Sequence, residues 1–347
     1  MTTFKNILRG LWLSFPIVII SGVALVGVSA QSTAPTVTPG KISTADMPDF
    51  ESYPSGVNAL SAPHVPPLVM LVMSRDEQLF NKAYPDYTDL DNDGKIDTTY
   101  NNAFIYNGYF DPDICYSYSS DSGTYSSSTR ATTHQCSGNW SGNFLNWVAM
   151  SRLDIIRWVL YGGTRSIDTA TSTVLERAEI PDDLHAWAKV YSGADINKYT
   201  PLTGTQTFCN VSTGNTGTTG GWNTPTQAIS GIKSTPVIRV ASGNWSDWAS
   251  TAKLQCQWRS GNGNAEGDSA RPSSGADYKA RVTVCKNGAV QPNESYCVAT
   301  GTSLKPEGLL QKYSKNGGSD IKRFGLVTGS VTNARKGGQL RRNIGKQ

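Results

Sequence analysis

The sequence predicts a mixed α/β domain with loop-rich insertions closed by disulfides, and three observations carry this prediction. Residues 68–73 form an unbroken apolar run of strand length, the pattern of a strand buried on both faces of a sheet. Residues 144–161 repeat apolar side chains at spacings of three and four, which indicates a helix. Six cysteines accompany 34 glycines and a hydrophobic content of only 38%, so we expect a modest core and many loops.

The first thirty residues have the composition of an export signal. Lys5 and Arg9 form a positive n-region, residues 11–28 are apolar and uncharged, and Val28-Ser29-Ala30 offers small residues to signal peptidase. An uncleaved membrane anchor is the alternative, because the apolar stretch nearly reaches spanning length. The small-residue end favours cleavage, so we predict a signal peptide over 1–30 and no stable membrane span after it. The mature protein is then exported, to the periplasm, the outer membrane or the cell surface.

A linker separates this signal from the folded part of the chain. Residues 31–67 hold seven of the 17 prolines and no periodic apolar pattern, which predicts an extended linker followed by one region over 68–347.

The net charge of +4 arises at the two ends of the chain. Without Lys5, Arg9 and the five basic residues after position 334, 24 of the 31 basic residues remain against 27 acidic ones. An acidic body gives no support to nucleic-acid binding.

Several elements can be placed along this region. The helix over 144–161 has Ser141 or Asn143 as a candidate N-cap and Gly162-Gly163 as its end. A second helix is predicted from Asp182 or Asp183 to Tyr191. Toward the C-terminus, Tyr278 to Cys285 and Phe324 to Thr328 have strand composition.

Three biased stretches, 117–129, 203–226 and 260–276, are rich in Ser, Gly or Thr. Such sequence buries too little surface to order itself, so covalent closure between cysteines is expected to substitute for core contacts. None of the cysteines has a C-x-x-C spacing, and an exported chain favours disulfides over metal ligation. We expect pairing in sequence order, with other connectivities open, among Cys115, Cys136, Cys209, Cys256, Cys285 and Cys297.

The sharpest local motif covers residues 89–97, which match D-x-D-x-D-G-x-x-D. Calcium takes six to eight hard oxygen ligands, and alternating Asp residues around a tight turn direct several carboxylates to one point. We therefore predict Ca²⁺ as the cofactor. The predicted ligands are Asp89, Asp91, Asp93, Lys95 through its carbonyl oxygen, and Asp97.

The twelfth residue counted from Asp89 is Tyr100, whereas an EF-hand loop has a bidentate Glu at position twelve. The motif is closer to the shorter Asp-rich loops of extracellular modules, and Asp86 or a distant carboxylate would complete the shell. A solvated acidic turn without metal is the alternative. All-oxygen ligation argues against zinc and copper.

No catalytic signature is present. The sequence has no G-x-S-x-G, H-E-x-x-H, Walker A or dinucleotide motif, and its three histidines are scattered, so no catalytic residues are predicted, and no cofactor-binding residues apart from the metal ligands. A Ser-Gly-Asn-Trp-Ser sequence occurs twice, at 137–141 and 242–246. We favour a structural role, in which each copy forms a turn that leads into a helix cap and packs its tryptophan ring beneath. The alternative is a pair of tryptophans that bind sugar.

Many ordered segments together resemble the N-terminal region of the PilY/PilC-type proteins, which are type IV pilus assembly factors and adhesins. These segments are Ser74–Phe80, Ala83-Tyr84, 89–97, Tyr106–Asp111, Gly142–Trp147, Met150–Asp154, Leu160–Gly163, Thr235–Val240, Asn244-Trp245, Trp248–Thr251, Lys305–Gln311 and Phe324–Leu326. The resemblance covers nearly everything after residue 66.

The resemblance implies a non-enzymatic, exported scaffold or adhesin that promotes pilus extension. Its expected partners are minor pilins or other pilus components, and host or abiotic surfaces. Family members continue into a calcium-dependent β-propeller. We expect the present sequence, whose last residue is Gln347, to end before that domain. The alternative is a free-standing, calcium-stabilised surface adhesin with carbohydrate- or protein-binding loops.

The family often carries a von Willebrand A-like domain, and three segments are compatible with a degenerate or incomplete sheet of that kind. They are the strand 68–73, the helix 150–160 and the strand 324–328. The D-x-S-x-S metal signature is replaced by Ser74-Arg75-Asp76-Glu77-Gln78, so a metal-dependent adhesion site of that type is not expected.

Overall fold

The computed structural model describes residues 67–181, 185–213, 235–251, 254–259, 267–286, 292–314, 322–329 and 338–345. The predicted signal peptide and residues 31–66 of the predicted linker lie outside these ranges. All described residues belong to one unit, Val65–Gln347. Within the described ranges, no helix combines the length and the apolar character that a membrane span requires.

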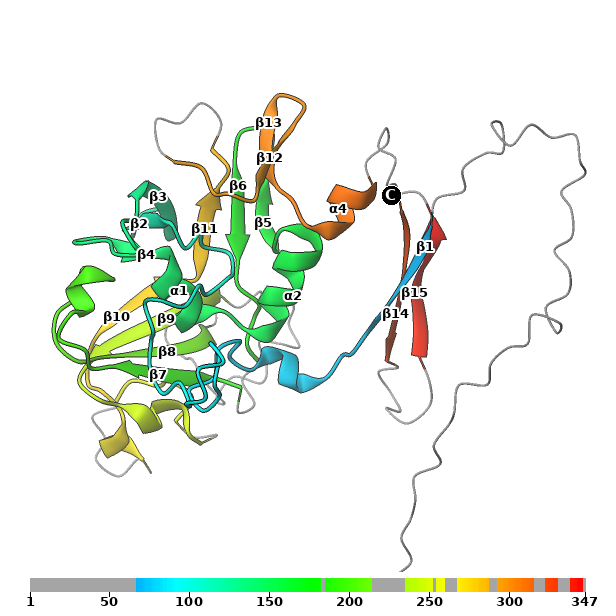
Figure 1. Cartoon of the computed structure of the whole chain (residues 1–347). Helices are drawn as coiled ribbons and strands as arrows, with labels where there is room; N and C mark the ends of the chain where they lie inside the picture. The colour runs from blue at the N-terminus through cyan, green and yellow to red at the C-terminus, as the bar shows by residue number, and fades with distance from the viewer. Residues whose placement is uncertain are drawn as a thin grey trace, which may run out of the picture. The chain divides into compact units, whose positions relative to one another are not determined.

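The mixed α/β prediction is confirmed, with four sheets in the described part of the chain (Figure 1). The six-stranded sheet has the order β4-β2-β3-β11-β6-β5, and the four-stranded sheet β10-β9-β8-β7. The strands of the first are Trp140–Ser141 (β4), Ile114–Ser119 (β2), Thr124–Arg130 (β3), Arg281–Val284 (β11), Thr173–Glu176 (β6) and Arg165–Asp168 (β5). Those of the second are Ala276–Lys279 (β10), Thr235–Ser242 (β9), Gln206–Thr213 (β8) and Trp187–Tyr191 (β7).

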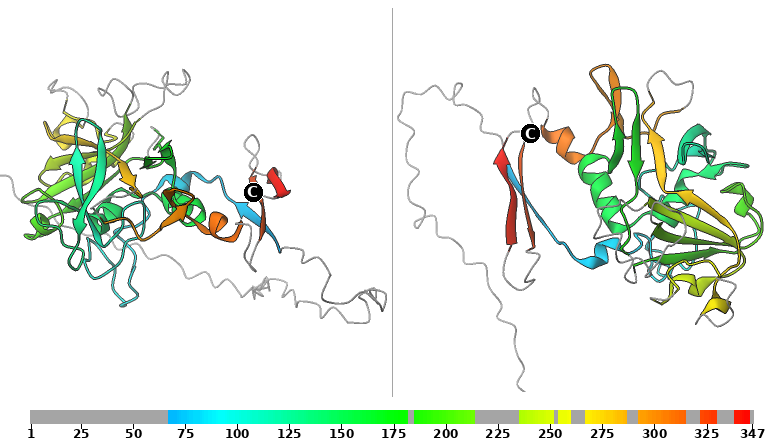
Figure 2. Two further views of the ribbon diagram at one scale, coloured as in Figure 1. Left: turned by 90° about the horizontal axis from the view of Figure 1, so that it is seen from above. Right: turned by 180° about the vertical axis from the view of Figure 1, so that it is seen from behind.

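Two smaller sheets, three α-helices and four short 3₁₀ helices complete the described elements. The parallel pair β1–β14 is extended by antiparallel β15, and β12 forms a hairpin with β13. These strands are Leu68–Met73 (β1), Arg323–Gly329 (β14), Gly338–Gly345 (β15), Cys297–Thr300 (β12) and Ser303–Pro306 (β13). The helices are Gly142–Ala149 (α1), Arg152–Tyr161 (α2) and Leu309–Ser314 (α4). Figure 2 shows α4 beside α2, where Gln311 Nε2 donates a hydrogen bond of 3.1 Å to Tyr161 O.

The single helix predicted over 144–161 is two helices. Ser141 caps α1 by accepting a hydrogen bond from Phe144 N, and Gly162 ends α2 with a φ of 77°, both at predicted positions. Between the helices, Ser151 has a φ of −88° and a ψ of 163°. Its hydroxyl accepts from Asp154 N while Asp154 accepts from Ser151 N, so a reciprocal capping box starts a new helix where periodicity alone predicted continuation.

The core is built around α1, all eight residues of which are buried. α1 lies between the six-stranded and four-stranded sheets (Figure 1) and contacts β2 and β4 of the first. Toward the second sheet, the Phe144 ring lies 5.3 Å from that of Phe208 on β8 and 5.6 Å from that of Tyr191 on β7. The helix therefore joins both sheets into one aromatic-rich core.

The loop prediction for the Ser-rich stretch 117–129 is wrong, because most of it forms the hairpin β2–β3. Tyr125 is fully buried, and its ring lies 5.4 Å from that of Phe110. A strand needs large side chains only on the face that packs against the core, and tyrosines supply them here. The composition of the stretch therefore underestimated the surface that it buries.

The loop prediction for 203–226 is also wrong in part, because residues 206–213 form β8. All eight residues of β8 are buried, between β7 and β9. Asn210 finds a partner in Val148 O, to which its Nδ2 donates over 3.0 Å. Residues 214–226 and 260–266 lie outside the described residues.

The second predicted helix is wrong over residues 187–191, which form β7; residues 182–184 lie outside the described ranges. Trp187, Lys189 and Tyr191 are buried and alternate with half-buried residues, and β7 pairs antiparallel with β8. Bulky alternating side chains suit a pleated surface, and tertiary pairing overrides the helix signal of the acidic residues Asp182 and Asp183.

The strand predicted over 68–73 is present as β1, but it is not buried on both faces. Leu68, Met70 and Val72 are 60%, 40% and 78% exposed. In the described part of the chain this sheet has three strands, and these three side chains, on one face of β1, are left largely uncovered. The von Willebrand A-like interpretation of this sheet stays a prediction.

The disulfides join the cysteines in sequence order: Cys115–Cys136, Cys209–Cys256 and Cys285–Cys297. Cys209 and Cys256 lie in a second buried cluster with Trp248. This bond fastens β8 to a segment that has little regular structure.

Removal of Cys209–Cys256, with its separation of 47 residues, is expected to destabilise the protein most. Loop-closure entropy predicts a loss of about 4 kcal/mol for the Cys209→Ala/Cys256→Ala variant, against about 3 kcal/mol for either shorter loop. Urea unfolding of the three double variants, followed by tryptophan fluorescence, measures the order. A larger loss for the Cys285→Ala/Cys297→Ala variant would contradict the expectation.

Candidate metal centre

In the acidic loop, residues 89–97, the structure brings together three of the four carboxylates predicted to bind calcium. Asp89, Asp91 and Asp97 each place one carboxylate oxygen within 4.8 Å of the other two. The Asp93 side chain is instead 50% exposed, with an oxygen 3.7 Å from Lys95 Nζ. The Lys95 side chain is 85% exposed, so the ammonium group extends into solvent.

Backbone amides orient the converging carboxylates. Gly94 N donates to Asp89 Oδ2 over 2.9 Å, and Leu90 N donates to Asp97 Oδ2 over 2.7 Å. Asn92 and Gly94 have φ values of 59° and 86°, the left-handed conformation that lets a chain turn tightly around a central point. The loop therefore holds its carboxylates close together despite their mutual repulsion.

Asn101 also belongs to this centre, although it lies outside the acidic sequence motif. Its Nδ2 donates to Asp91 Oδ2 over 3.0 Å, and its backbone N donates to Tyr106 Oη over 3.1 Å. Burial raises the pKa of Tyr106 to about 12, and the charges of the nearby carboxylates add to the shift. The only sequence signal for Asn101 is its position shortly after the acidic motif, next to Tyr100.

Tyr100, at position twelve of the motif, anchors the C-terminal side of the loop in the core. It is 6% exposed, and its ring lies 5.5, 5.1 and 4.9 Å from those of Tyr106, Phe144 and Tyr199. Its hydroxyl accepts a hydrogen bond of 3.0 Å from Asn143 Nδ2. Tyr100 therefore replaces the metal ligand of an EF-hand with a packing contact.

A buried lysine fixes the N-terminal side of the loop. Lys189 on β7 donates from Nζ to Tyr84 O (2.6 Å) and Asp86 Oδ1 (2.9 Å), and Nζ lies 4.1 Å from the centre of the Trp147 ring. Burial lowers the pKa of Lys189 to about 7, and the charge of Asp86 opposes that shift. Asp86 also pairs with Lys82 over 2.6 Å, so the residue considered for completing the calcium shell is committed to two ion pairs.

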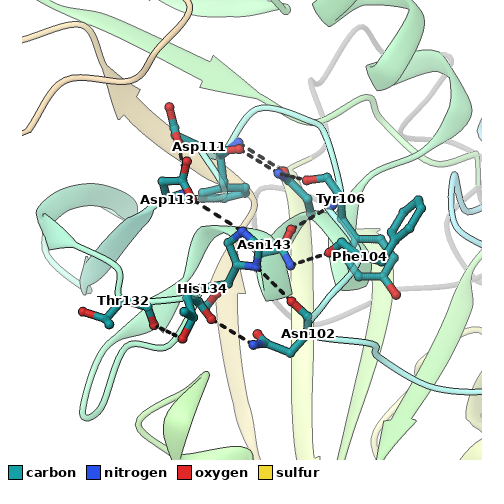
Figure 3. A network of polar contacts seen from close by, with 12 residues as sticks. Asn102, Phe104, Tyr106, Asp111, Asp113, Thr132, His134 and Asn143 are labelled. Carbon is teal, nitrogen blue, oxygen red and sulfur yellow. Dashed lines mark hydrogen bonds and ion pairs between the residues drawn. The ribbon is translucent and has the colours of Figure 1, made fainter. Parts of the chain in front are cut away.

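Between these anchors, α1 supplies partners for irregular backbone (Figure 3). Asn143 Oδ1 accepts from Tyr106 N over 2.8 Å, and Asn143 Nδ2 donates to Phe104 O over 2.9 Å. One turn later, Asn146 Nδ2 donates to Tyr106 O and to Phe110 O, each over 2.7 Å. Both side chains are fully buried, so the segment after the acidic loop is hydrogen-bonded to the core without forming a strand.

Figure 3 also shows how the start of this segment, next to Tyr100, is held. His134 Nδ1 lies 2.9 Å from Asn102 O, and its Nε2 lies 3.4 Å from Asp113 Oδ1. Asn102 Nδ2 donates to Thr133 O over 2.9 Å. His134 thus links the turn after β3 to the backbone next to Tyr100.

A second acidic cluster has its oxygens occupied. Asp111 and Glu294 are each 3% exposed. Asp111 Oδ2 accepts from Ser295 N over 2.6 Å, and Glu294 Oε2 accepts from Cys285 N over 2.9 Å. Burial raises the pKa of Glu294. Cys285 and Cys297 lie beside Glu294, but their sulfurs are joined in a disulfide and are not free to bind metal.

Comparison with known proteins agrees with the resemblance noted in the sequence. Residues 97–241 match a family model described as the small alpha/beta domain of PilY1 homologs. Two proteins of Xylella fastidiosa, both named type IV pilus biogenesis factor PilY1 homolog, are similar to the chain. One is 34% identical over 291 residues, covering 79% of this chain and 19% of the relative; the other is 30% identical over 243 residues, covering 62% and 17%.

The chain spans less than a fifth of the length of these relatives. No solved structure was found to match it. The family model and both relatives point to the same group, which confirms the identification made from the sequence motifs: the chain is a PilY1-type protein, matching the N-terminal region of that group.

Proposed function

We propose that this chain is a non-enzymatic part of a type IV pilus biogenesis factor that acts outside the cytoplasm through contacts with minor pilins or other pilus components. The similarity to a relative named as a pilus biogenesis factor, 34% identity over 291 residues, carries this proposal. Three disulfides fit an exported protein. Contact with host or abiotic surfaces is the adhesive part of the proposal.

The buried carboxylates support a non-enzymatic role. A general acid and base need free oxygens in reach of a substrate. Asp111 Oδ1 accepts from Asp113 N over 2.9 Å, and Glu294 Oε1 accepts from the Tyr116 hydroxyl over 3.3 Å, in addition to the backbone contacts of their second oxygens. These two carboxylates therefore hold chain segments together and are poorly placed for catalysis.

Calcium is the ion proposed for the acidic loop. Asp89, Asp91 and Asp97 supply three hard oxygen donors at one point, and the chain turns around them in the left-handed conformation that such loops use. The Lys95 carbonyl and waters would complete the shell, as would Asp93 after a change of side-chain rotamer. A divalent cation would also neutralise the repulsion among the three carboxylates.

Calcium is expected to raise the Tm of the purified protein, measured by circular dichroism in calcium chloride and in EDTA. At a calcium concentration a hundred times the Kd, binding stabilises the folded protein by about 2.7 kcal/mol. Asp91→Ala should abolish the difference, whereas Asp121→Ala, which removes an exposed carboxylate in the β2–β3 turn, should retain it. Equal Tm values with and without calcium for the unmodified protein would reject the site.

Tyr100→Glu, which restores the EF-hand residue, is expected to destabilise the protein instead of tightening calcium binding. A carboxylate at this position would be buried among aromatic rings, and core substitutions of an aromatic residue cost about 3–5 kcal/mol. Tyr100→Phe, the matched control, loses only hydroxyl hydrogen bonds, for about 1 kcal/mol. Urea unfolding and calcium titration of both variants test this. Tighter calcium binding by a stable Tyr100→Glu protein would show that position twelve faces the ion.

Deletion of the gene is expected to reduce piliation and twitching motility in the bacterium that encodes it, and the full gene should restore both. Complementation of the deletion strain with the Asp91→Ala variant separates the pilus proposal from the calcium proposal. Normal piliation with this variant would mean that the pilus role does not depend on calcium binding. Wild-type piliation and twitching in the deletion strain would contradict the pilus role and would favour the free-standing adhesin.

A further inference from the structure

The two copies of the Ser-Gly-Asn-Trp-Ser sequence have different structural roles. In the first copy, Trp140 is 3% exposed and Ser141 caps α1, as predicted for a turn with a packed indole. In the second copy, Gly243 turns the chain with a φ of 100°, and Trp245 is only half-buried. The second indole therefore lies at the surface.

Trp245 lines a groove of about 490 Å³ at one end of the four-stranded sheet, where β8 begins, β9 ends and β10 begins. This volume falls within the range of small-molecule sites, about 300–1,000 Å³. The aromatic residues Trp245 and Tyr278 are among those that line it, and no residue that lines it carries a charge. The polar side chains of this Trp245 groove are Thr203, Gln206, Ser242, Ser273 and Ser274.

Hydrogen bonds fix the Trp245 side of the groove. The indole Nε1 donates to Ser242 O over 2.8 Å, and Trp245 N donates to Thr207 Oγ1 over 2.9 Å. The Thr207 hydroxyl in turn donates to Gly243 O over 2.7 Å. Gln206 Nε2 donates to Ser242 Oγ over 3.3 Å, which ties a polar lining residue to the same wall. The indole is thus oriented before any ligand arrives, which lowers the entropy cost of binding.

The aromatic core fixes the other ring. Tyr278 has its ring 5.0 Å from that of Trp140 and 4.9 Å from that of Tyr118, in edge-to-face geometry. Trp140 of the first copy therefore packs against the lining residue Tyr278, and the second copy contributes Trp245 to the lining. Both aromatic surfaces are held rigidly.

We propose that the Trp245 groove binds a neutral saccharide of one or two sugar units. The apolar C–H faces of a sugar ring pack on aromatic rings, and its hydroxyls require hydrogen-bonding partners, which the serine, threonine and glutamine side chains offer. The uncharged lining disfavours sialylated, uronic or phosphorylated sugars, since a buried charge needs an opposite charge. A proline-rich peptide would use the rings but leave most of the hydroxyl groups unpaired. The proposal rests on the adhesive part of the proposed function and names its class of ligand.

Saturation-transfer difference NMR on the purified chain tests the groove, with cellobiose, lactose and N,N′-diacetylchitobiose as probes. At least one disaccharide is expected to receive saturation, and Trp245→Ala should weaken its binding about tenfold or more, as truncation of a central aromatic contact does. Trp245→Phe keeps an aromatic surface and should lose less. Ser273→Arg places a large charged side chain at an exposed lining position, so it should block binding even if Trp245→Ala fails to fold.

Tyr87→Ala is the matched control, because Tyr87 is 63% exposed and lies outside the groove lining; it should bind like the unmodified protein. Three results would overturn the proposal: no disaccharide binds, Ser273→Arg binds as before, or only sialyllactose or a polyproline peptide binds. Piliation of the Ser273→Arg strain separates this proposal from the pilus role, because normal pili with lost saccharide binding leave that role intact.

Discussion

Two buried amides on α1 are the contacts on which much of the structure depends. The backbone of residues 104–110 is irregular yet runs through the core, where an unpaired backbone group costs about 1–3 kcal/mol. Asn143 and Asn146 provide these groups with donors and acceptors at depths that water does not reach. Because both side chains come from one face of a fully buried helix, the segment adopts the shape of that helix surface.

This constraint determines what a metal ion can do in the acidic loop. In an EF-hand, the ligand at position twelve connects the ion to a helix that moves. Here that position is filled by Tyr100, whose packing and hydrogen bond to Asn143 are independent of metal. On the other side, Lys189 holds Asp86 and the Tyr84 carbonyl. An ion bound between two such fixed ends would stiffen a surface loop and leave the arrangement of the sheets unchanged.

The sequence predicted those features that depend on local chemistry. Ser141 and Gly162 were placed as helix ends because capping depends on a side-chain oxygen and on a left-handed φ. The acidic loop followed from ligand spacing, although the structure gathers only three of its carboxylates. The break between the two helices at Ser151 was not predicted, because a capping box inside an apolar repeat does not disturb the periodicity of that repeat.

Features that depend on distant partners could not be predicted in this way. The Ser-rich hairpin becomes a strand pair because Tyr125 meets Phe110 and the edges of neighbouring strands, none of which composition reveals. Lys189 resembles a surface residue in the sequence, and its burial depends on Asp86, more than one hundred residues away. β1 shows the reverse case. Its apolar run indicates a strand that is covered on both faces, whereas its side chains alternate between exposed and half-buried.

The divergence of the two Ser-Gly-Asn-Trp-Ser copies follows from what comes next in each. After Ser141 the chain enters α1, which has no other indole near its start, and Trp140 takes the buried position. After Ser246 a single 3₁₀ turn, Ser246–Ala249, brings a further indole, Trp248, which is fully buried against the Cys209–Cys256 disulfide. Trp248 Nε1 donates to Gln257 O, so this ring satisfies both the packing and the polar needs of the cluster. With that position filled, Trp245 only packs against the cluster and stays half-buried, so the same five residues that build a helix cap in one place present part of an aromatic ring at the surface in the other.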